Sequence, residues 1–201
     1  MKRLLVALLL LPSMAGAGAL SDLLMSPGGF GDAPDGPLLA YREQRSVPAE
    51  SGLQPLDDGR LTVARVEGTN GPALAVAREV DGKAQPVAEV SVGGANPVLL
   101  YFLEATVRDL SQATGGNPYY IRNRMREALV AADLGPASVP RDVTLSPFAA
   151  DRNRARLGSY ADLTLRLRFD EDRPGDLLEL SSDTAEAGEG YHHRLTLIAE
   201  D

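Results

Sequence analysis

The stretch GGNPYYIRNRMREAL, residues 115–129, brings hydrogen-bond donors and positive charges to the start of a predicted helix. Asn followed by Pro is typical of a helix N-terminus, where unpaired backbone N–H groups and the helix dipole attract negative charge. Such an end, completed by nearby polar side chains, could bind a small anionic ligand or an acidic group of a partner protein. The candidate ligand-binding residues are Asn117, Tyr119, Arg122, Asn123 and Arg126.

The arginines of this stretch also have a structural interpretation. Helical spacing puts Arg122 and Arg124 on the two sides of a buried stripe and Arg126 further out. Arginines in such positions commonly lay their stems along the apolar edge and keep their charged ends in water. A second, similar run, DRNRARLG at 151–158, could complement the first in space. We expect packing to account for the arginines, with the anion site as the alternative. The predicted stripe consists of Ile121, Met125, Ala128, Leu129 and Ala132.

His192 and His193 are the two histidines of the chain and could take part in catalysis or metal binding. Neighbouring residues of a strand point to opposite faces, so the pair cannot easily share one ion. The acidic side chains that could add oxygen ligands are Asp183, Glu186, Glu189 and those of DEDRPGD at 170–176. Neither acidic segment has the spacing of an EF-hand, so we expect no metal site.

Enzyme motifs are missing from the sequence. It contains no cysteine, which removes thiol nucleophiles, thiolate metal sites and disulfides. It also lacks G-x-S-x-G, S-x-x-K, H-E-x-x-H, the P-loop and the dinucleotide fingerprint. Ser159 or Ser181 could form a triad with a histidine, but no spacing indicates one. We therefore expect no cofactor and a binding protein rather than an enzyme, with a cofactor-free hydrolase as the alternative.

The first nineteen residues, MKRLLVALLLLPSMAGAGA, have the layout of a secretory signal peptide. Lys2 and Arg3 precede an apolar run at 4–11, which is followed by small residues suited to signal peptidase. The apolar run is far shorter than the roughly 20 residues that cross a bilayer, so we expect no membrane insertion of the mature chain. Cleavage after Ala17 or Ala19 would release a periplasmic or secreted protein.

Charge and composition limit the class of partner. The chain has a net charge of −8, and loss of Lys2 and Arg3 with the signal peptide would make it −10. Such a charge disfavours nucleic acid and anionic membrane surfaces as partners. The composition, rich in Arg, Ala and Gly and poor in Lys, is typical of a GC-rich bacterial genome. The expected role is that of an exported, soluble binding or interaction module of the bacterial cell envelope.

Residues 20–60 are expected to form a flexible arm. SPGGFGDAPDGP is a run of turn residues, and the segment after it has no sustained periodicity beyond a short strand near 38–42. Residues 61–201 are expected to form a single α+β domain, because a mature chain of about 180 residues can bury one core without disulfides.

Two predicted helices begin with the same residue pattern. GGANP and GGNP each place Asn at the N-cap and Pro at the first helical position, which suits both residues. The helices are expected at 97–113 and 118–133, capped by Asn96 and Asn117, with Gly115 ending the first. A connection this short makes them an antiparallel hairpin.

The remaining predicted elements are strands. Asp81-Gly82 indicates a type I′ hairpin turn, because both central positions of that turn need positive φ. The alternation of apolar and polar residues in ADLTLRLRF predicts a strand with one buried face. The predicted strands are 61–66, 73–80 and 86–92 and the segments DVTLSPF, ADLTLRLRF, DLLELSSD and YHHRLTLIA.

The order of the predicted elements is β-β-β-α-α-β-β-β-β. Strands that precede and follow a pair of helices, rather than alternating with helices, indicate an α+β fold. We predict an antiparallel β-sheet, or a partial sandwich, whose apolar face is covered by the two-helix antiparallel hairpin.

Overall fold

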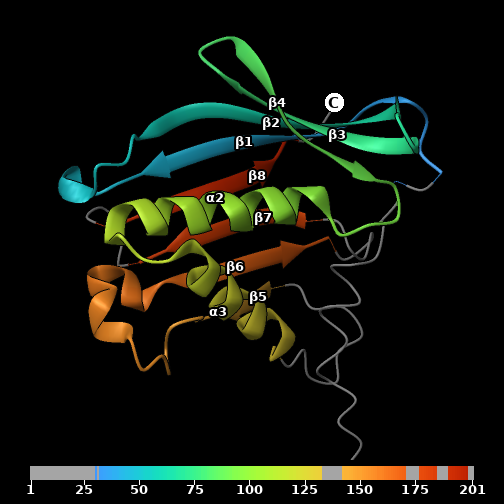
Figure 1. The fold of residues 1–201 in the computed structure, drawn as a ribbon. Helices are drawn as coiled ribbons and strands as arrows, with labels where there is room; N and C mark the ends of the chain where they lie inside the picture. The colour runs from blue at the N-terminus through green and yellow to red at the C-terminus, as the bar shows by residue number, and fades with distance from the viewer. Residues whose placement is uncertain (1–29, 31, 133–141, 171–176, 185–189, 199–201) are drawn as a thin grey trace, which may run out of the picture.

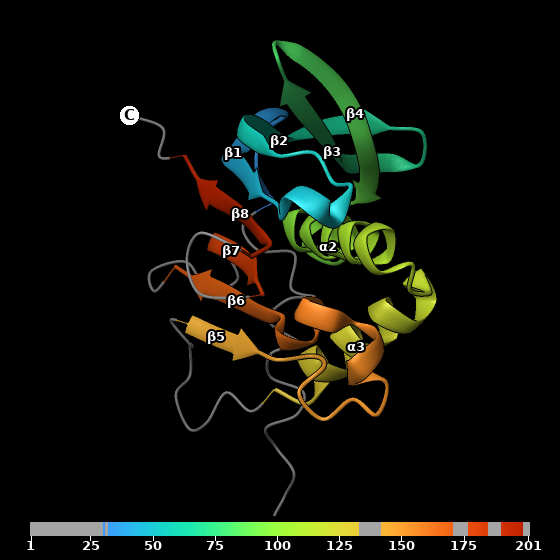
Figure 2. The same cartoon turned by 90° about the vertical axis from the view of Figure 1, so that its left-hand side faces the viewer.

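The computed structural model describes residues 30, 32–132, 142–170, 177–184 and 190–198. Its main elements, in chain order, are β1 (Gly36–Ser46), β2 (Leu56–Gly68), β3 (Gly71–Val80), β4 (Lys83–Ser91), α2 (Pro97–Thr114), α3 (Pro118–Val130), β5 (Asp142–Leu145), β6 (Thr164–Phe169), β7 (Leu177–Asp183) and β8 (His192–Leu197). The strands form an eight-stranded sheet in the order β4-β3-β2-β1-β8-β7-β6-β5, and all neighbours are antiparallel. Both helices lie against one face of this sheet (Figures 1 and 2). The predicted α+β fold is confirmed, with one additional strand before the predicted order.

The two halves of the sheet are antiparallel meanders that meet at its centre. Strands β1–β4 form one meander and β5–β8 form the other. β1 pairs with β8 from Tyr41↔Leu197 to Ser46↔His192, so the first and last strands join the halves. The chain leaves the sheet at edge strand β4, crosses its face as α2 and α3, and returns at the opposite edge as β5 (Figure 1). The helices cover the sheet because the chain must pass from one edge to the other.

Side-chain alternation places the core on the helix side of the sheet. In β6, Leu165, Leu167 and Phe169 are 0–1% exposed, whereas Arg166 and Arg168 between them are exposed. This is the alternation predicted for ADLTLRLRF. The β2–β4 end of the sheet bends over α2 (Figure 2), and α2 contacts both β3 and β7. One helix therefore packs against both halves of the sheet.

Both helices begin as predicted. Asn96 Oδ1 accepts hydrogen bonds from two backbone N–H groups of the first turn, at 3.0 and 3.2 Å. Asn117 Oδ1 accepts one from the Tyr119 N–H at 2.8 Å. Gly115 follows α2 with a φ of 66°, a left-handed value that suits glycine. Helix α3 ends at 130, short of the predicted 133.

The turn between β3 and β4 is also as predicted. Asp81 and Gly82 have φ values of 53° and 71°, positive at both central positions, and Val80 pairs with Lys83 across the turn. The resulting hairpin protrudes from the sheet (Figure 1). Pro86 and a register irregularity opposite it interrupt the outer edge of β4, which limits pairing with a further strand.

The structure differs from the predicted flexible arm over residues 36–60. Residues 36–46 form β1, which joins the two halves of the sheet, and β2 already begins at 56. The short strand predicted near 38–42 lies within β1, but the sequence did not indicate its full length. Two positions on the helix-facing side of β1 are charged, Glu43 and Arg45, so apolar residues do not alternate along it. Residues 1–29, which hold the predicted signal peptide and the start of the predicted arm, lie outside the described residues.

Candidate functional site

Helix α2 lies between a buried polar cluster and an apolar groove. On its sheet-facing side, Tyr101 and Asp109 bond to Glu43 and Arg45 of β1 among buried apolar residues such as Phe102. The side that faces α3 carries apolar residues that line a groove open to solvent. The buried side includes His193, and the groove includes two of the predicted site residues, Arg122 and Arg126.

Glu43 is the centre of the buried polar cluster. Its Oε2 accepts a hydrogen bond from Arg78 Nε at 2.6 Å. Its Oε1 accepts one from the Tyr101 hydroxyl at 2.9 Å and lies 3.1 Å from His193 Nε2, which donates in the tautomer that a carboxylate selects. Glu43 and His193 are 1% and 0% exposed, and the imidazole stacks on Phe102 with ring centroids 5.3 Å apart. The cluster thereby connects both halves of the sheet to α2.

Hydrogen bonds keep Glu43 charged inside the core. Burial by itself would raise the pKa of this carboxyl group, but the hydrogen bonds from His193 and Arg78 outweigh burial and lower the pKa to about 2. Burial beside the Glu43 charge raises the pKa of the Tyr101 phenol well above its usual value. An efficient general base or acid has a pKa near the working pH. Neither group is close to that condition, so their arrangement suits a structural role.

A second buried carboxylate, Asp109, lies on the same side of α2. Arg45 NH1 donates to both of its oxygens, at 2.9 and 3.0 Å, and the Tyr191 hydroxyl donates to Oδ2 at 2.9 Å. Asp109 is 4% exposed. Each buried carboxylate thus has one arginine and one tyrosine among its partners, which is what a charged group in a core requires.

The hydrolase alternative places a catalytic site between the helical hairpin and the sheet. Glu43 and His193 do meet there, but both are enclosed by the core. His193 Nδ1, the ring nitrogen that faces away from Glu43, has no hydrogen-bond partner among the described residues. A triad would need a nucleophilic hydroxyl on that nitrogen and an opening for substrate. The described geometry therefore resembles a buried structural pair more than a catalytic one.

His192 has different partners from His193, as expected for neighbours on a strand. Its Nδ1 lies 2.8 Å from Asp183 Oδ1, and Ser181 Oγ donates to the other oxygen of that carboxylate at 2.8 Å. The serine hydroxyl is bonded to the carboxylate and not to the imidazole. This order differs from that of a catalytic triad, in which the imidazole lies between the other two groups.

The acidic residues considered as metal ligands are only partly covered by the structure. Glu186, Glu189 and residues 171–176 lie outside the described residues. In the part of the chain that is described, no three His, Asp or Glu side chains come together as a metal site would require.

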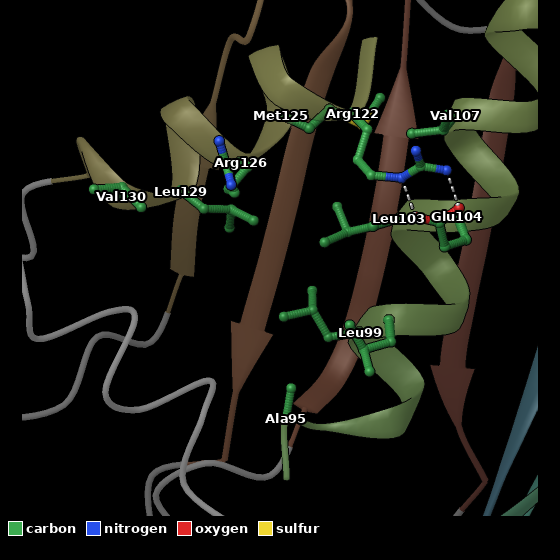
Figure 3. Close-up of a pocket in the computed structure, with 11 residues that line it drawn as sticks. Ala95, Leu99, Leu103, Glu104, Val107, Arg122, Met125, Arg126, Leu129 and Val130 are labelled. Atoms are coloured by element: carbon green, nitrogen blue, oxygen red, sulfur yellow. Dashed lines mark hydrogen bonds and ion pairs between the residues drawn. The ribbon is translucent and has the colours of Figure 1, made fainter. Parts of the chain in front are cut away.

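The predicted anion site lies at the surface, and its first arginine is already paired. Arg122 donates to both oxygens of Glu104 on α2, at 2.5 and 2.7 Å (Figure 3). Its guanidinium also lies 5.5 Å from the ring centroid of Tyr119, which is 72% exposed. The hydrogen bonds from Arg122 lower the pKa of Glu104. An anion at this end of α3 would have to compete with Glu104 for the Arg122 charge.

The other predicted residues of the site are the N-cap Asn117, Asn123 and Arg126. The side-chain oxygen of Asn117 already accepts a hydrogen bond from the backbone N–H of Tyr119 in α3. Asn123 and Arg126 lie further along the helix, and both are exposed. Arg126 has no ion-pair partner among the described residues, in contrast to Arg122. Arg126 is therefore the arginine of the predicted site whose charge is open to a ligand.

The second arginine-rich run meets α3 on a different side. The Tyr120 hydroxyl donates to Asp151 at 2.7 Å, and Asn153 Nδ2 donates to the same hydroxyl at 2.9 Å. Arg124 Nε lies 3.5 Å from Asp151 Oδ2, and Arg124 Nη1 lies 2.8 Å from Glu127 Oε2. The two runs are neighbours in space, as the sequence allowed, but an acidic residue lies between them. Their contact holds α3 against the turn that precedes β6.

An apolar groove lies between α2 and α3 (Figure 3). Its volume is about 370 Å³, which is within the range of small-ligand sites. The apolar residues of its α2 wall are Leu99, Leu100, Leu103 and Val107, and those of its α3 wall are Met125, Leu129 and Val130. The charged residues that line it are Glu104, Arg122 and Arg126. The Arg122–Glu104 pair bridges the two helices at one end of the groove (Figure 3).

Exposed apolar side chains concentrate at this groove. In the described part of the chain, the large hydrophobic residues that are exposed are Val87, Leu100, Tyr119 and Val130. Leu100 and Val130 line the groove, one on each wall. Tyr119 lies against Arg122, which lines it too. The groove is thus the place where the described fold leaves apolar surface uncovered.

Sequence reasoning missed Glu43 and Asp109, the two carboxylates buried between α2 and the sheet. Glu43 fell in the predicted arm, where no strand pattern drew attention to it. Asp109 was visible in principle, because Tyr101, Ala105 and Asp109 form a row at four-residue spacing beside the buried stripe of the first helix. A carboxylate next to a core face needs a buried partner. Residue spacing could not identify that partner as Arg45, because Arg45 lies 64 positions away in the chain.

No protein-family model matches the chain, and no curated protein matches it. None of the helices in the described ranges is long and apolar enough to cross a membrane. The basis for a functional proposal is therefore the geometry of the chain's own residues.

Proposed function

We propose that the protein is an exported, non-catalytic binding module of the bacterial cell envelope and that it binds its ligand in the α2–α3 groove. The observation that carries this proposal is the apolar surface left in water at the groove, where Leu100 and Val130 are 40% and 50% exposed. A single exposed leucine is ordinary. A continuous apolar groove with exposed residues on both walls is typical of an interaction site.

The rigidity of the groove supports a binding role. Helix α2 is held from beneath by Tyr101 and Asp109, which bond to residues of the sheet. Helix α3 is held by Ile121 and Met125, which are 0% and 1% exposed, and by the Tyr120 hydrogen bond to the turn before β6. A site whose walls are already positioned loses little conformational entropy on binding.

Binding is favoured over catalysis by the positions of the histidines. His193 is enclosed with Glu43, whose low pKa makes it a permanent charge and not a proton acceptor. His192 is bonded to Asp183. Neither lines the groove. Turnover of a generic ester by the wild-type protein, lost in a His192→Asn or His193→Asn variant, would favour the hydrolase alternative instead.

The sequence of residues 1–19 supports export. The mature protein is expected to begin at Gly18 or Leu20, where small residues occupy both positions that signal peptidase recognises. The intact mass of the protein recovered from the soluble envelope fraction tests this. A full-length mass in that fraction would contradict the export proposal without bearing on the groove.

Binding in the groove can be tested with a neutral naphthylamine dye, whose fluorescence rises in apolar surroundings. We expect saturable binding to the wild-type protein and its loss in Val130→Glu, which puts a charge on the α3 wall. Val87→Glu is the matched control, because Val87 is 42% exposed and lies on β4 away from the groove. Both replaced residues are exposed, so both variants should keep the wild-type unfolding curve. Equal dye binding by the two variants would contradict the proposed site.

A further inference from the structure

We propose that the ligand of the groove is a free single-chain amphiphile with one negatively charged head group, of which a medium-chain carboxylate is the simplest example. Its hydrocarbon chain lies between α2 and α3, and its head group is bound by Arg126. This inference rests on the proposed function and adds the chemical class of the ligand.

The dimensions of the groove suit one extended hydrocarbon chain. Its walls run from Leu99 to Val107 on α2 and from Arg122 to Val130 on α3, and such separations on a helix correspond to about 12 Å. The volume of about 370 Å³ lies within the range of small-ligand sites. A chain of methylenes of about that length therefore fits between the two walls.

The charges around the groove match one anionic group. Arg122 is bonded to Glu104, and Arg124 lies against Asp151 on another side of α3. Arg126 lines the groove, is exposed, and has no ion-pair partner among the residues that the structure describes. One open cation beside an apolar groove complements a ligand with a single negative charge and an apolar body.

A macromolecular occupant fits these dimensions less well. A footprint about 12 Å long and roughly 10 Å wide, the usual spacing of packed helices, covers on the order of 120 Å². Stable protein interfaces bury about 800 Å² on each partner. The net charge of −8 also disfavours an anionic bilayer as the source of the chain. A free amphiphile, by contrast, can bury most of its own surface in a site of this size.

The test is displacement of the neutral dye from the full chain by octanoate, decanoate and dodecanoate. Each methylene that enters the groove raises affinity about fourfold. Decanoate is therefore expected to bind about fifteenfold more tightly than octanoate, with a smaller gain for dodecanoate once the groove is full. Affinities that do not depend on chain length would overturn the proposal.

The head group is tested by Arg126→Gln with decanoate and decanol, which share one chain length. We expect the variant to bind decanoate about tenfold more weakly, because a charge-assisted hydrogen bond is lost, and to bind decanol as the wild type does. Arg108→Gln is the control, since Arg108 is exposed on α2 but does not line the groove, and the change removes the same charge. An equal loss of decanoate and decanol in Arg126→Gln would overturn the assignment of the head group.

The failure of this inference can be distinguished from failure of the proposed function. If Val130→Glu abolishes dye binding but decanoate does not displace the dye, the groove binds another class of ligand and the amphiphile proposal is wrong. Tighter displacement by an acidic amphipathic peptide than by dodecanoate would also overturn it, as would binding to anionic phospholipid vesicles in place of free decanoate. If the dye binds Val130→Glu as well as the wild type, the proposed function itself fails.

Discussion

The two sides of helix α2 carry opposite exceptions to the usual distribution of polarity. Each side also contributes buried apolar residues, such as Phe102 towards the sheet and Leu99 towards α3. On the sheet side, Glu43 and Asp109 are buried, and each is bonded to an arginine and a tyrosine. On the α3 side, Leu100 and Val130 are among the apolar residues that face a groove open to water. The two carboxylates inside have hydrogen-bond partners, whereas Leu100 and Val130 lack an apolar cover.

The two sides of α2 are therefore expected to differ in role. The buried side serves assembly of the fold, and the groove serves the proposed binding. The buried cluster takes residues from β1, β3, β8 and α2, so its hydrogen bonds form only when the two halves of the sheet and the helix are in register. Removing one member of such a cluster leaves an uncompensated charge in the core, which is costly. Leu100 and Val130 are partly hydrated in the folded state, so we expect changes at these two residues to have less effect on stability.

The largest effect on stability is expected from Glu43→Ala, which would disrupt the buried polar cluster and leave the groove intact. Arg78 and His193 would lose their acceptor in the core. We expect the free energy of unfolding to fall by about 3–5 kcal/mol, measured by chemical denaturation, with dye affinity of the folded protein unchanged. A loss below about 1 kcal/mol would remove the contrast between the two sides. A change in dye affinity would show that they are not independent.

Lowering the pH should reduce stability through the same carboxylate, by slightly less than Glu43→Ala does. The pKa of Glu43 is about 2 in the folded protein and near the ordinary glutamate value of 4.5 when unfolded. Its stabilising contribution is complete above pH 4.5 and is lost as the pH falls towards 2, because the unfolded state takes up the proton first. The full loss is about 3 kcal/mol. Urea unfolding between these pH values should show a steeper decline for the wild type than for Glu43→Gln. Parallel declines would contradict the pKa.

The two N-caps extend the comparison to the helix ends. Asn96 is 4% exposed and accepts two backbone hydrogen bonds, whereas Asn117 is exposed and accepts one. We expect Asn96→Ala to cost about 2 kcal/mol and Asn117→Ala about 1 kcal/mol in chemical denaturation. Asn117→Ser and Asn117→Asp should be nearly silent. If Ala and Asp at position 117 behave alike, the capping explanation is wrong.

The smallest effects are expected on the open side. Arg122→Gln breaks a pair with Glu104 whose side chains are 41% and 47% exposed, so it should cost at most about 1 kcal/mol and less at high salt. Arg126→Gln should change stability by less than about 0.5 kcal/mol, because its charge has no partner among the described residues. Unfolding curves at low and high salt provide the measurement. Greater destabilisation by Arg126→Gln than by Arg122→Gln would indicate that Arg126 serves packing and not a ligand.

Local chemistry explains which elements were predictable. Asn96 and Asn117 cap helices because their own side chains reach the next backbone N–H groups, and Asp81-Gly82 makes a hairpin because both residues tolerate positive φ. The alternation in β6 reports directly which face is buried. Only a short strand near 38–42 was predicted within β1, because Glu43 occupies a buried position that a sequence pattern reads as exposed.

The candidate site was only partly predictable for a related reason. The sequence placed Arg122 at one edge of an apolar stripe and Arg126 further out, and both line the groove. It could not show that Glu104 pairs with Arg122. Leu129 was expected on the apolar stripe of the second helix, and it lines the groove that faces α2. Whether the space between two apolar stripes closes or stays open depends on how the helices are held apart.

The periodic elements, their caps and their α+β order follow from local sequence, because those depend on residues within a few positions of one another. Three features arise only in the folded chain: the pairing of Glu43 with Arg78 and His193, the place of β1 at the centre of the sheet, and the groove between α2 and α3. Each of these depends on contacts between residues far apart in the chain. Such contacts depend on the position of whole elements, which local propensity and periodicity do not specify.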